Sequence, residues 1–312
     1  MKATTHTELY RKYDEPLHPR PPVERILAWS GLRQSFRQKL RTVLTFTPSI
    51  IAALAGCMTV HMSFTLTELA SSMDSSGGQV GETIGSVLGS VAENIYRFLQ
   101  IEQFFALLTV SWFGSRLIAD DRKLSANLLY FARPITPLRY IIGKMGTACT
   151  VGVLTLLLPT LLICAQASFS SPDWVFLTDN YGVIVAVFGY SALWIVVMSS
   201  VVLAISSCFK RKSLALMCIF VLAFMIEGIS QVLMQALDST QYGLLSLTHN
   251  LQAISRWLFH ESNLITNMVQ QTSGMNKNFG DNISANFMAL GAMTLLSWIV
   301  LWRNVKRMEV VS

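Results

Sequence analysis

Charged residues are scarce in this chain, and their scarcity excludes the commonest class of protein. Asp, Glu, Lys and Arg make up 13% of the 312 residues, whereas apolar residues make up 52%. Charged residues fill about 25% of an ordinary soluble domain. A chain this long and this apolar would leave large apolar patches in water if it folded as one globule. The composition therefore predicts a polytopic membrane protein.

The sequence also lacks the motifs of a self-contained enzyme. Its five cysteines form no C-x-x-C pair, so neither a disulfide framework nor a zinc site is indicated. The phosphate-binding pattern G-x-x-x-x-G-K-[ST] does not occur, and neither does G-x-S-x-G or H-E-x-x-H. We therefore expect no catalytic residues, no cofactor and no metal site in this chain.

Long apolar stretches are what the chain has in their place. Six of them come close to or exceed the ~20 residues that cross ~30 Å of hydrocarbon. They cover residues 43–60, 98–118, 138–165, 181–209, 214–233 and 283–302. The pattern predicts an all-α fold in which residues 42–312 form a domain of six transmembrane helices. Long external loops are expected at about 61–97 and 234–282.

The distribution of positive charge predicts the orientation of these helices. All but three of the 24 Lys and Arg residues fall on one side of the predicted membrane, the exceptions being Arg97, Arg256 and Lys277. Lys and Arg are enriched in cytoplasmic connections. Both termini are therefore expected in the cytoplasm.

The region before the first span divides into two parts. Residues 1–22 are polar and contain four prolines, which predicts a disordered cytoplasmic tail. In residues 23–41, apolar and basic positions alternate at roughly helical spacing. This pattern favours an amphipathic helix on the membrane surface, with its cations toward the lipid headgroups. The alternative is a plain basic flank for the first span.

Residues 116–144 connect the second and third spans and are rich in both charge signs. Three apolar positions recur there at i, i+4 and i+7, namely Leu124, Leu128 and Phe131. That spacing places them on one face of a helix. Asp120 and Asp121 would cap its start, and Pro134 would end it. We therefore expect a short cytoplasmic helix that lies crosswise between two membrane helices.

This connection resembles the cytoplasmic loop of ABC-2-type permeases, the membrane subunits of ATP-binding-cassette transporters. The likeness rests on an acidic-basic cluster, a leucine pair, an R-P-I-T sequence, an Arg-Tyr pair and a Gly-Lys pair. In order these are Asp120-Asp121-Arg122-Lys123, Leu128-Leu129, Arg133-Pro134-Ile135-Thr136, Arg139-Tyr140 and Gly143-Lys144. With the six spans and a similar stretch at 245–259, the likeness covers most of the chain. It is closest to the group that includes copper-enzyme-maturation and gliding-motility permeases.

The resemblance implies a function and a set of partners. It implies a permease in the bacterial cytoplasmic (inner) membrane, with export favoured, driven by a separate cytoplasmic ATPase that binds the ATP. A second permease copy, a periplasmic partner at the external loops and membrane lipid are the other expected partners, with no nucleic acid among them. The residues implied to couple to the ATPase are Asp120, Asp121, Arg122, Lys123, Leu124, Leu128, Leu129 and Phe131, with Arg133 and Lys144 as flanking support.

Polar residues inside the spans suggest a translocation path. Glu227 and Gln231 lie one turn apart in the fifth span, and Glu102 lies in the second. A carboxylate at membrane depth is costly and often marks a polar pathway. The alternative is that Glu102 and Glu227 lie near the outer interface, where water hydrates them. An ion-coupled secondary transporter or a non-transporting scaffold is therefore the alternative function.

Overall fold

The computed structural model of the chain describes residues 22–37, 39–73, 91–124, 126, 135–171, 176, 178, 180–237, 239–261 and 283–310. All secondary structure in these residues is helical. The elements, in chain order, are α1 (Val23–Phe36), α2 (Lys39–Met73), α4 (Val91–Lys123), α6 (Pro137–Gly152), the π-helix η2 (Val153–Leu157), α7 (Leu158–Ser170), α9 (Tyr181–Cys208), α10 (Lys212–Ala236), the 3-10 helix η4 (Thr240–Leu245), α11 (Leu247–Glu261) and α13 (Ile283–Val310). The all-α fold expected from the sequence is confirmed for this part of the chain.

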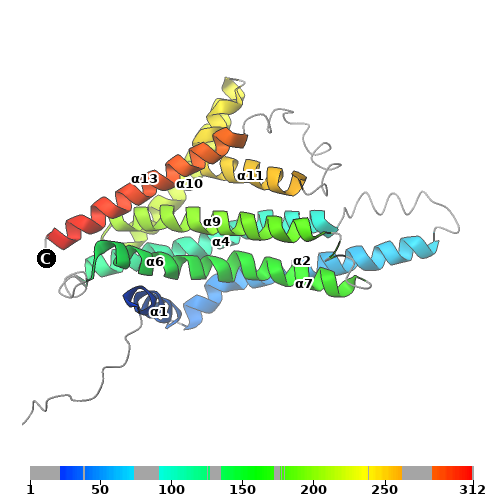
Figure 1. Cartoon of the computed structure of the whole chain (residues 1–312), viewed down its shortest axis with the longest axis horizontal. Coiled ribbons are helices and arrows are strands. Elements are labelled where there is room, and N and C mark those ends of the chain that lie inside the picture. The colour runs from blue at the N-terminus through cyan, green and yellow to red at the C-terminus, as the bar shows by residue number, and fades with distance from the viewer. Residues whose placement is uncertain are drawn as a thin grey trace, which may run out of the picture.

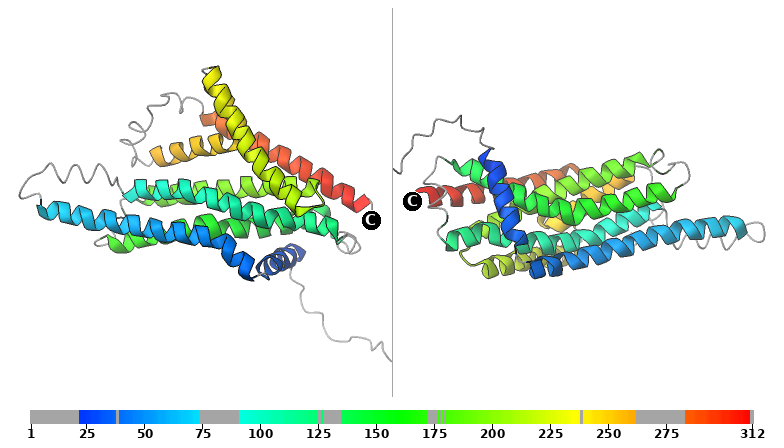
Figure 2. Two further views of the ribbon diagram at one scale, coloured as in Figure 1. Left: turned by 180° about the vertical axis from the view of Figure 1, so that it is seen from behind. Right: turned by 90° about the horizontal axis from the view of Figure 1, so that it is seen from below.

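The long helices run side by side and form an elongated bundle (Figure 1). Helices α4 and α9 occupy its centre, where α4 packs against α2, α6, α9 and α10. The short α1 crosses one end of the bundle and packs on α6 (Figure 2). On the other side of the bundle, α11 and α13 pack against each other and against α9. The central position of α4 and α9 explains why both are rich in buried residues.

Within the described residues, five segments are long and apolar enough to span a membrane. They are Thr42–Leu66, Pro137–Ser170, Tyr181–Cys208, Lys212–Ala236 and Ile283–Met308. Each corresponds to one of the six stretches expected from the sequence. The chain therefore has the character of a multi-pass membrane protein. The remaining stretch, 98–118, stays a prediction.

That stretch lies within α4, which is long enough to span but less apolar than the other five helices. Several polar residues of α4 lie inside the protein, since Glu102, Thr109, Ser111 and Ser115 are all buried. A helix surrounded by other helices needs no lipid-like surface, because its polar groups find partners inside the bundle. Its central position thus accounts for the low hydropathy of α4.

The outer helices show the opposite pattern. In α2, α10 and α13, less than a fifth of the most apolar window is buried, and large side chains such as Leu54, Met217 and Leu296 are exposed. Such surfaces are stable only against lipid or another apolar partner. The bundle therefore has a polar-containing centre and an apolar outer surface.

Three boundaries differ from the sequence-based expectation. The helix expected over 23–41 ends at Phe36, and α2 begins at Lys39. The first external loop, expected at 61–97, is partly helical, because α2 continues to Met73 and α4 begins at Val91. The second loop, expected to be external at 234–282, is also partly helical, because α10 continues to Ala236 and both η4 and α11 lie within this range. The buried residues of α11 include Leu251, Ile254 and Phe259.

Candidate coupling site at the basic end of the bundle

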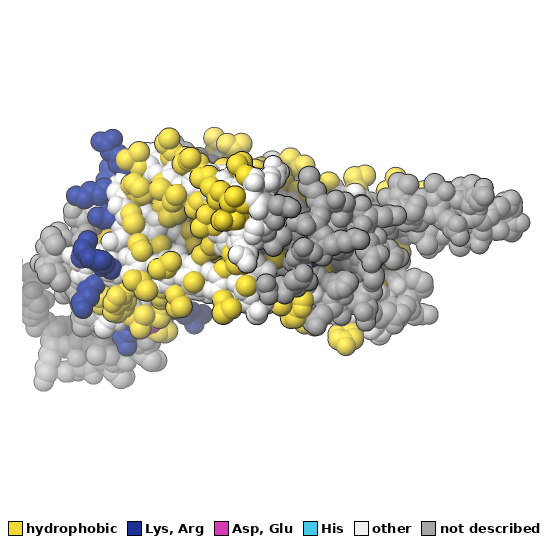
Figure 3. Space-filling model, turned by 90° about the horizontal axis from the view of Figure 1, so that it is seen from above, with side chains coloured by type: hydrophobic (Ala, Val, Ile, Leu, Met, Phe, Trp, Pro, Cys, Tyr) yellow, Lys and Arg dark blue, Asp and Glu magenta, His cyan; other side chains and the backbone are white. Residues whose placement is uncertain are grey.

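Exposed Lys and Arg side chains gather at the end of the molecule where α13 stops (Figure 3). The connection between α9 and α10 and the last turns of α13 both carry them. These residues are Lys210, Arg211, Lys212, Arg303, Lys306 and Arg307, all exposed. Hydrophobic side chains dominate the surface beyond this band (Figure 3). We refer to this part of the molecule as the basic end.

The sequence predicted that Asp120 and Asp121 would cap the start of a helix. This prediction is wrong. Both lie in the last turn of α4, which continues to Lys123. Negative charge is unfavourable at a helix C-terminus, where the backbone carbonyls point outward. The two aspartates therefore depend on cations from elsewhere, and the structure provides one for Asp121.

The Asp121 carboxylate forms a buried ion pair with Lys144 of α6. The Lys144 Nζ lies 2.6 Å from Asp121 Oδ2, and the two side chains are only 4% and 11% exposed. Tyr140, one turn before Lys144, donates its hydroxyl to the same oxygen at 2.7 Å. The Lys144 Nζ also lies 5.5 Å from the centre of the Tyr140 ring. This cluster holds the end of α4 to the start of α6.

The next residue, Arg122, holds α4 to α9. Its guanidinium donates to the carbonyl of Ser207, in the last turn of α9. The last carbonyls of a helix have no partner within it, so a basic side chain satisfies them well. Asn304 of α13 donates to the Ser207 hydroxyl at 3.0 Å and to the Cys208 thiol at 3.3 Å. Four helices are thus joined at the basic end.

Helix α1 is attached to α6 at the same end. Glu24 pairs with Arg139 at 3.3 Å, at the surface. Deeper in, Thr147 donates its hydroxyl to the Ala28 carbonyl at 3.1 Å. A Cβ at Gly143 would lie 2.7 Å from Leu27 Cβ, so only glycine allows this approach. The first half of α6 therefore contacts α1 through one face and α4 through another.

Between these elements lies a small polar recess of about 90 Å³. Helices α1, α4, α6 and α10 line it with Gly31, Gln34, Ser35, Arg116, Leu117, Asp120, Asp121, Lys144 and Lys212. At about 30 Å³ per water, the recess can hold a few water molecules. It gives the charged groups hydration without opening the bundle.

The structure separates the implied coupling residues into three groups. Asp121 and Arg122 are held by internal partners, as described above. Asp120 is half-buried at the recess, and Lys123 and Leu124 are exposed just beyond it. The remaining members are Leu128, Leu129 and Phe131, which lie outside the described residues, as does the flanking Arg133. The coupling role of all these residues stays a prediction.

Glu102 is completely buried between α2, α4 and η2. Ser49 of α2 donates to one of its carboxylate oxygens and lies 3.3 Å from the carbonyl of Thr155. That carbonyl is four residues before Pro159, which has no backbone N–H to donate to it. Pro159 follows the π-helix at Val153–Leu157, and the single Ser49 hydroxyl proton can go either to the Thr155 carbonyl or to Glu102.

A second polar chain, which the sequence did not reveal, crosses the bundle nearby. Tyr190 of α9 donates to the Gln103 amide, and Gln103 donates to Gln100 at 2.7 Å. Gln100 then donates to Ser255 of α11 at 3.0 Å. The repeated glutamines in α4 were visible in the sequence, but their partners lie 87 and 155 residues away.

Glu227 belongs to a different cluster, between α10 and α11. It accepts hydrogen bonds from Ser246 and from Gln231, the latter at 3.0 Å. The backbone N–H of His249 donates to the Ser246 hydroxyl at 3.1 Å. Burial of the His249 ring lowers its pKa, although the nearby Glu227 acts in the opposite direction. Glu102 and Glu227 therefore accept hydrogen bonds from different residues.

Comparison with models of known protein families gives no match, and comparison with curated proteins gives none either. Functional inference therefore depends on the residues and contacts of the chain itself.

Proposed function

We propose that this protein is the membrane-spanning subunit of an ATP-binding-cassette transporter and that a separate ATPase drives it. The observation that supports this most is the buried Asp121–Lys144 pair, which holds the helices before and after the connection 124–136 together. A push on this connection would act on α4 and α6 as one unit. Arg122 would pass the displacement to α9. Rigid-body tilting of packed helices is a common way to change access to a path.

The proposal extends to the partners and the membrane. The basic end would face the cytoplasm of a bacterium, in line with the enrichment of Lys and Arg there. The exposed apolar faces of α2, α10 and α13 leave room for a second permease copy within the membrane. ATP would bind only to the partner, because this chain has no phosphate-binding loop. Export is the favoured direction.

Co-purification tests the proposal directly. The tagged chain is expressed with the genes that neighbour its own and purified in mild detergent. We expect a P-loop ATPase to co-purify and ATP hydrolysis to require that subunit. Leu128→Glu should abolish both, because a charge replaces an apolar anchor of the expected docking helix. Ala126→Glu, on the opposite face by helical spacing, should leave both unchanged.

Two results would count against this function. The isolated chain, free of contaminants, could itself hydrolyse ATP. Alternatively, the Leu128→Glu variant could keep both complex and activity. Aggregation of Leu128→Glu would show that Leu128 packs against helices of its own chain.

Ion-coupled transport is the second candidate, and Glu102 is the observation that favours it. A carboxylate without exposure inside a helix bundle can serve as a proton or cation relay. Transport assays in vesicles separate the two candidates. Ion-coupled transport would be supported if a proton or sodium gradient drove uptake or efflux without ATP. The Glu102→Gln variant should then lose this transport.

A further inference from the structure

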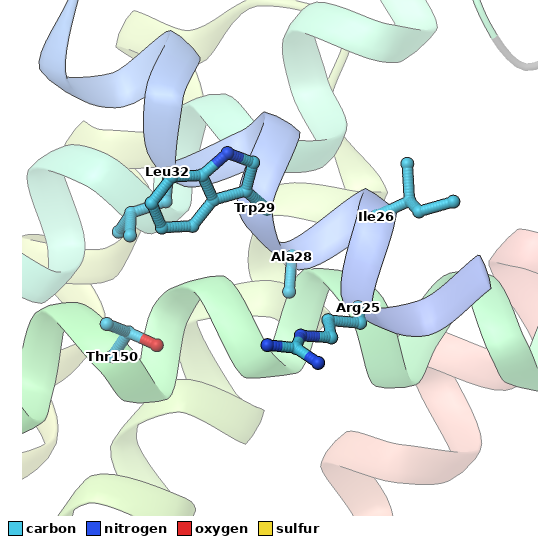
Figure 4. A pocket seen from close by; sticks show the side chains of 6 residues that line it. All are labelled: Arg25, Ile26, Ala28, Trp29, Leu32 and Thr150. Atoms are coloured by element: carbon cyan, nitrogen blue, oxygen red, sulfur yellow. The ribbon is translucent and has the colours of Figure 1, made fainter. Parts of the chain in front are cut away.

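An open groove lies between α1 and α6 at the basic end. It has a volume of about 650 Å³, within the range of about 300–1,000 Å³ that small-molecule sites cover. Its lining is apolar except for one charged side chain, that of Arg25, and one hydroxyl, that of Thr150 (Figure 4). The remaining lining residues are Ile26, Ala28, Trp29 and Leu32.

We propose that this groove binds one phospholipid with an anionic headgroup, whose phosphate contacts Arg25 and whose acyl chain lies along Trp29, Leu32 and Thr150. The site goes beyond the coupling function, since it would exist whatever the protein transports. It also differs from general attraction of a basic helix to the membrane surface, because it has a defined shape and one defined cation.

The polar mouth of the groove can accept an anion. Within the described part of the chain, no hydrogen bond or ion pair engages the Arg25 side chain, which is exposed. The one acidic residue beside it, Glu24, pairs instead with Arg139 at 3.3 Å. A guanidinium donates two parallel hydrogen bonds to a phosphate group, a geometry that favours phosphate over other partners.

The apolar part of the groove requires a hydrocarbon chain. Trp29 is 68% exposed and Ile26 49% exposed, although both are large apolar side chains. Tryptophan is enriched at the boundary between headgroups and hydrocarbon. Thr150 lies 13 residues into the Pro137–Ser170 segment, about 20 Å along it at 1.5 Å per residue. The groove therefore runs from the basic end along the first part of an apolar segment, a path that the acyl chain of a lipid can follow.

Charge also distinguishes a lipid from a second copy of this chain. Helix α1 carries two exposed arginines, Arg25 and Arg33, and Arg37 follows directly at its end, whereas Glu24 is its single acidic residue. A second α1 in the groove would bring further positive charge to Arg25. Anionic lipid of the cytoplasmic leaflet brings negative charge, which attracts Lys and Arg side chains near the surface.

The test is lipid titration of the delipidated, full-length protein, followed by native mass spectrometry. The probes are dioleoyl-phosphatidylglycerol and dioleoyl-phosphatidylcholine, which share their acyl chains and differ in net charge. We expect one phosphatidylglycerol to bind about tenfold more tightly than phosphatidylcholine. Arg25→Gln should remove this preference, whereas Arg25→Lys should retain most of it. Trp29→Ala should weaken the binding of both lipids.

The matched control is Arg33→Gln, which removes the same charge from the same helix but lies outside the groove. It should leave the preference unchanged. Equal losses in Arg25→Gln and Arg33→Gln would reduce the effect to general surface charge and overturn the site. Glycerol phosphate that competes as well as the intact lipid would overturn it too, because the apolar groove would then contribute nothing to binding.

Two further outcomes would assign the groove to another occupant and would also overturn the proposal. Cross-linking between two copies through a cysteine at Trp29 would identify it as a dimer contact. Phosphatidylglycerol binding that appears only after deletion of residues 2–21 would identify the chain's own N-terminal segment as the occupant. Melting temperature and monodispersity, recorded on each sample, confirm that every variant is folded.

Discussion

At the scale of single residues, the Asp121–Lys144 pair combines burial, which disfavours both charges, with close contact between the opposite charges. Both side chains are almost fully buried, and one carboxylate oxygen receives both the Lys144 ammonium and the Tyr140 hydroxyl. Replacing a whole buried pair by apolar groups is often neutral, but removing one partner strands the other charge. The pair is therefore sensitive to single substitutions and tolerant of a matched double one.

Lys144→Met tests this sensitivity. We expect it to lower the stability of the detergent-solubilised protein by about 3–5 kcal/mol, because Asp121 remains buried without its cation. Adding Asp121→Asn should restore much of the loss. Arg139→Met is the control, since the Arg139–Glu24 pair lies at the surface and should contribute less than about 1 kcal/mol. Melting temperatures of the four proteins give the comparison, and equal effects of Lys144→Met and Arg139→Met would refute it.

His249 supplies a prediction about pH. The ring is buried beside Gly243, with Glu227 and Arg256 as its charged neighbours, and burial lowers its pKa below the usual value of about 6.5. The unfolded chain therefore binds the proton more readily than the folded one. This contribution to stability is complete above about pH 6.5 and is lost as the pH falls below it, by at most about 1.4 kcal/mol per unit.

The measurement is the melting temperature between pH 7.5 and 5, for the natural protein and for His249→Asn. The variant should lose part of the decline at acidic pH. If both proteins show the same decline, His249 is not responsible for it.

How far residue roles could be predicted from sequence depends on the distance between partners. Asp121, Lys144 and Tyr140 all lie in the stretch that resembles ABC-2-type permeases, yet their contact in one cluster could not be predicted from the sequence. The expectation of a helix start at Asp120 followed local capping rules. It was wrong because α4 continues to Lys123. Lys144 of α6 supplies the positive charge that stabilises Asp121 in this last turn.

At the scale of elements, the contact between α1 and α6 depends on the absence of side chains. Three glycines, Gly31, Gly143 and Gly146, lie where the two helices cross. Close helix approach through small residues provides packing within a membrane, where burial alone gives little driving force. The two residues of the Gly-Lys pair at 143–144 therefore contact different helices. Gly143 allows α1 to pack closely on α6, and Lys144 forms the ion pair with Asp121 of α4.

A pair of alanine substitutions tests this crossing. A Cβ at Gly143 would lie 2.7 Å from Leu27 Cβ and 3.2 Å from the Glu24 carbonyl, so Gly143→Ala must push α1 away from α6. Overpacking of this kind typically costs about 1–3 kcal/mol. A Cβ at Gly146 would lie 3.4 Å from Ala28 Cβ, which is ordinary contact, so Gly146→Ala should be neutral or slightly stabilising.

Thermal melting distinguishes the two variants, and cross-linking between cysteines introduced on α1 and α6 shows whether the helices have separated. Equal stability of Gly143→Ala and Gly146→Ala would mean that α1 can shift at no cost.

The elements themselves were largely predictable, because hydrophobicity and length decide membrane helices. Five of the expected spans have counterparts in the structure with similar bounds. The exact end of α1 was not predictable, since the break at residues 37–38 lies within a continuous basic pattern. The π-helix before Pro159 also escaped prediction, because a proline in a membrane helix indicates disturbance without specifying its form.

At the scale of the whole molecule, polarity is distributed along two directions. Across the bundle, polar groups concentrate in α4 and its contacts, while α2, α10 and α13 expose apolar surface. Along the bundle, Lys and Arg gather at one end (Figure 3). The apolar outer surface is suited to contact with lipid. The concentration of Lys and Arg at one end predicts that this end faces the cytoplasm.

This orientation can be tested with a membrane-impermeant thiol reagent on intact cells. Cysteine introduced at Asn276 or Asn278, in the predicted second external loop, should react from outside. Cys208 provides an internal control, because it is exposed at the basic end, next to Asn304. It should react only after the membrane has been permeabilised. The physical reason is the same for both positions: the side with nearly all of the Lys and Arg stays in the cytoplasm. Labelling of Cys208 in intact cells, with Asn276→Cys and Asn278→Cys protected, would reverse the orientation and place the coupling site outside the reach of any cytoplasmic ATPase.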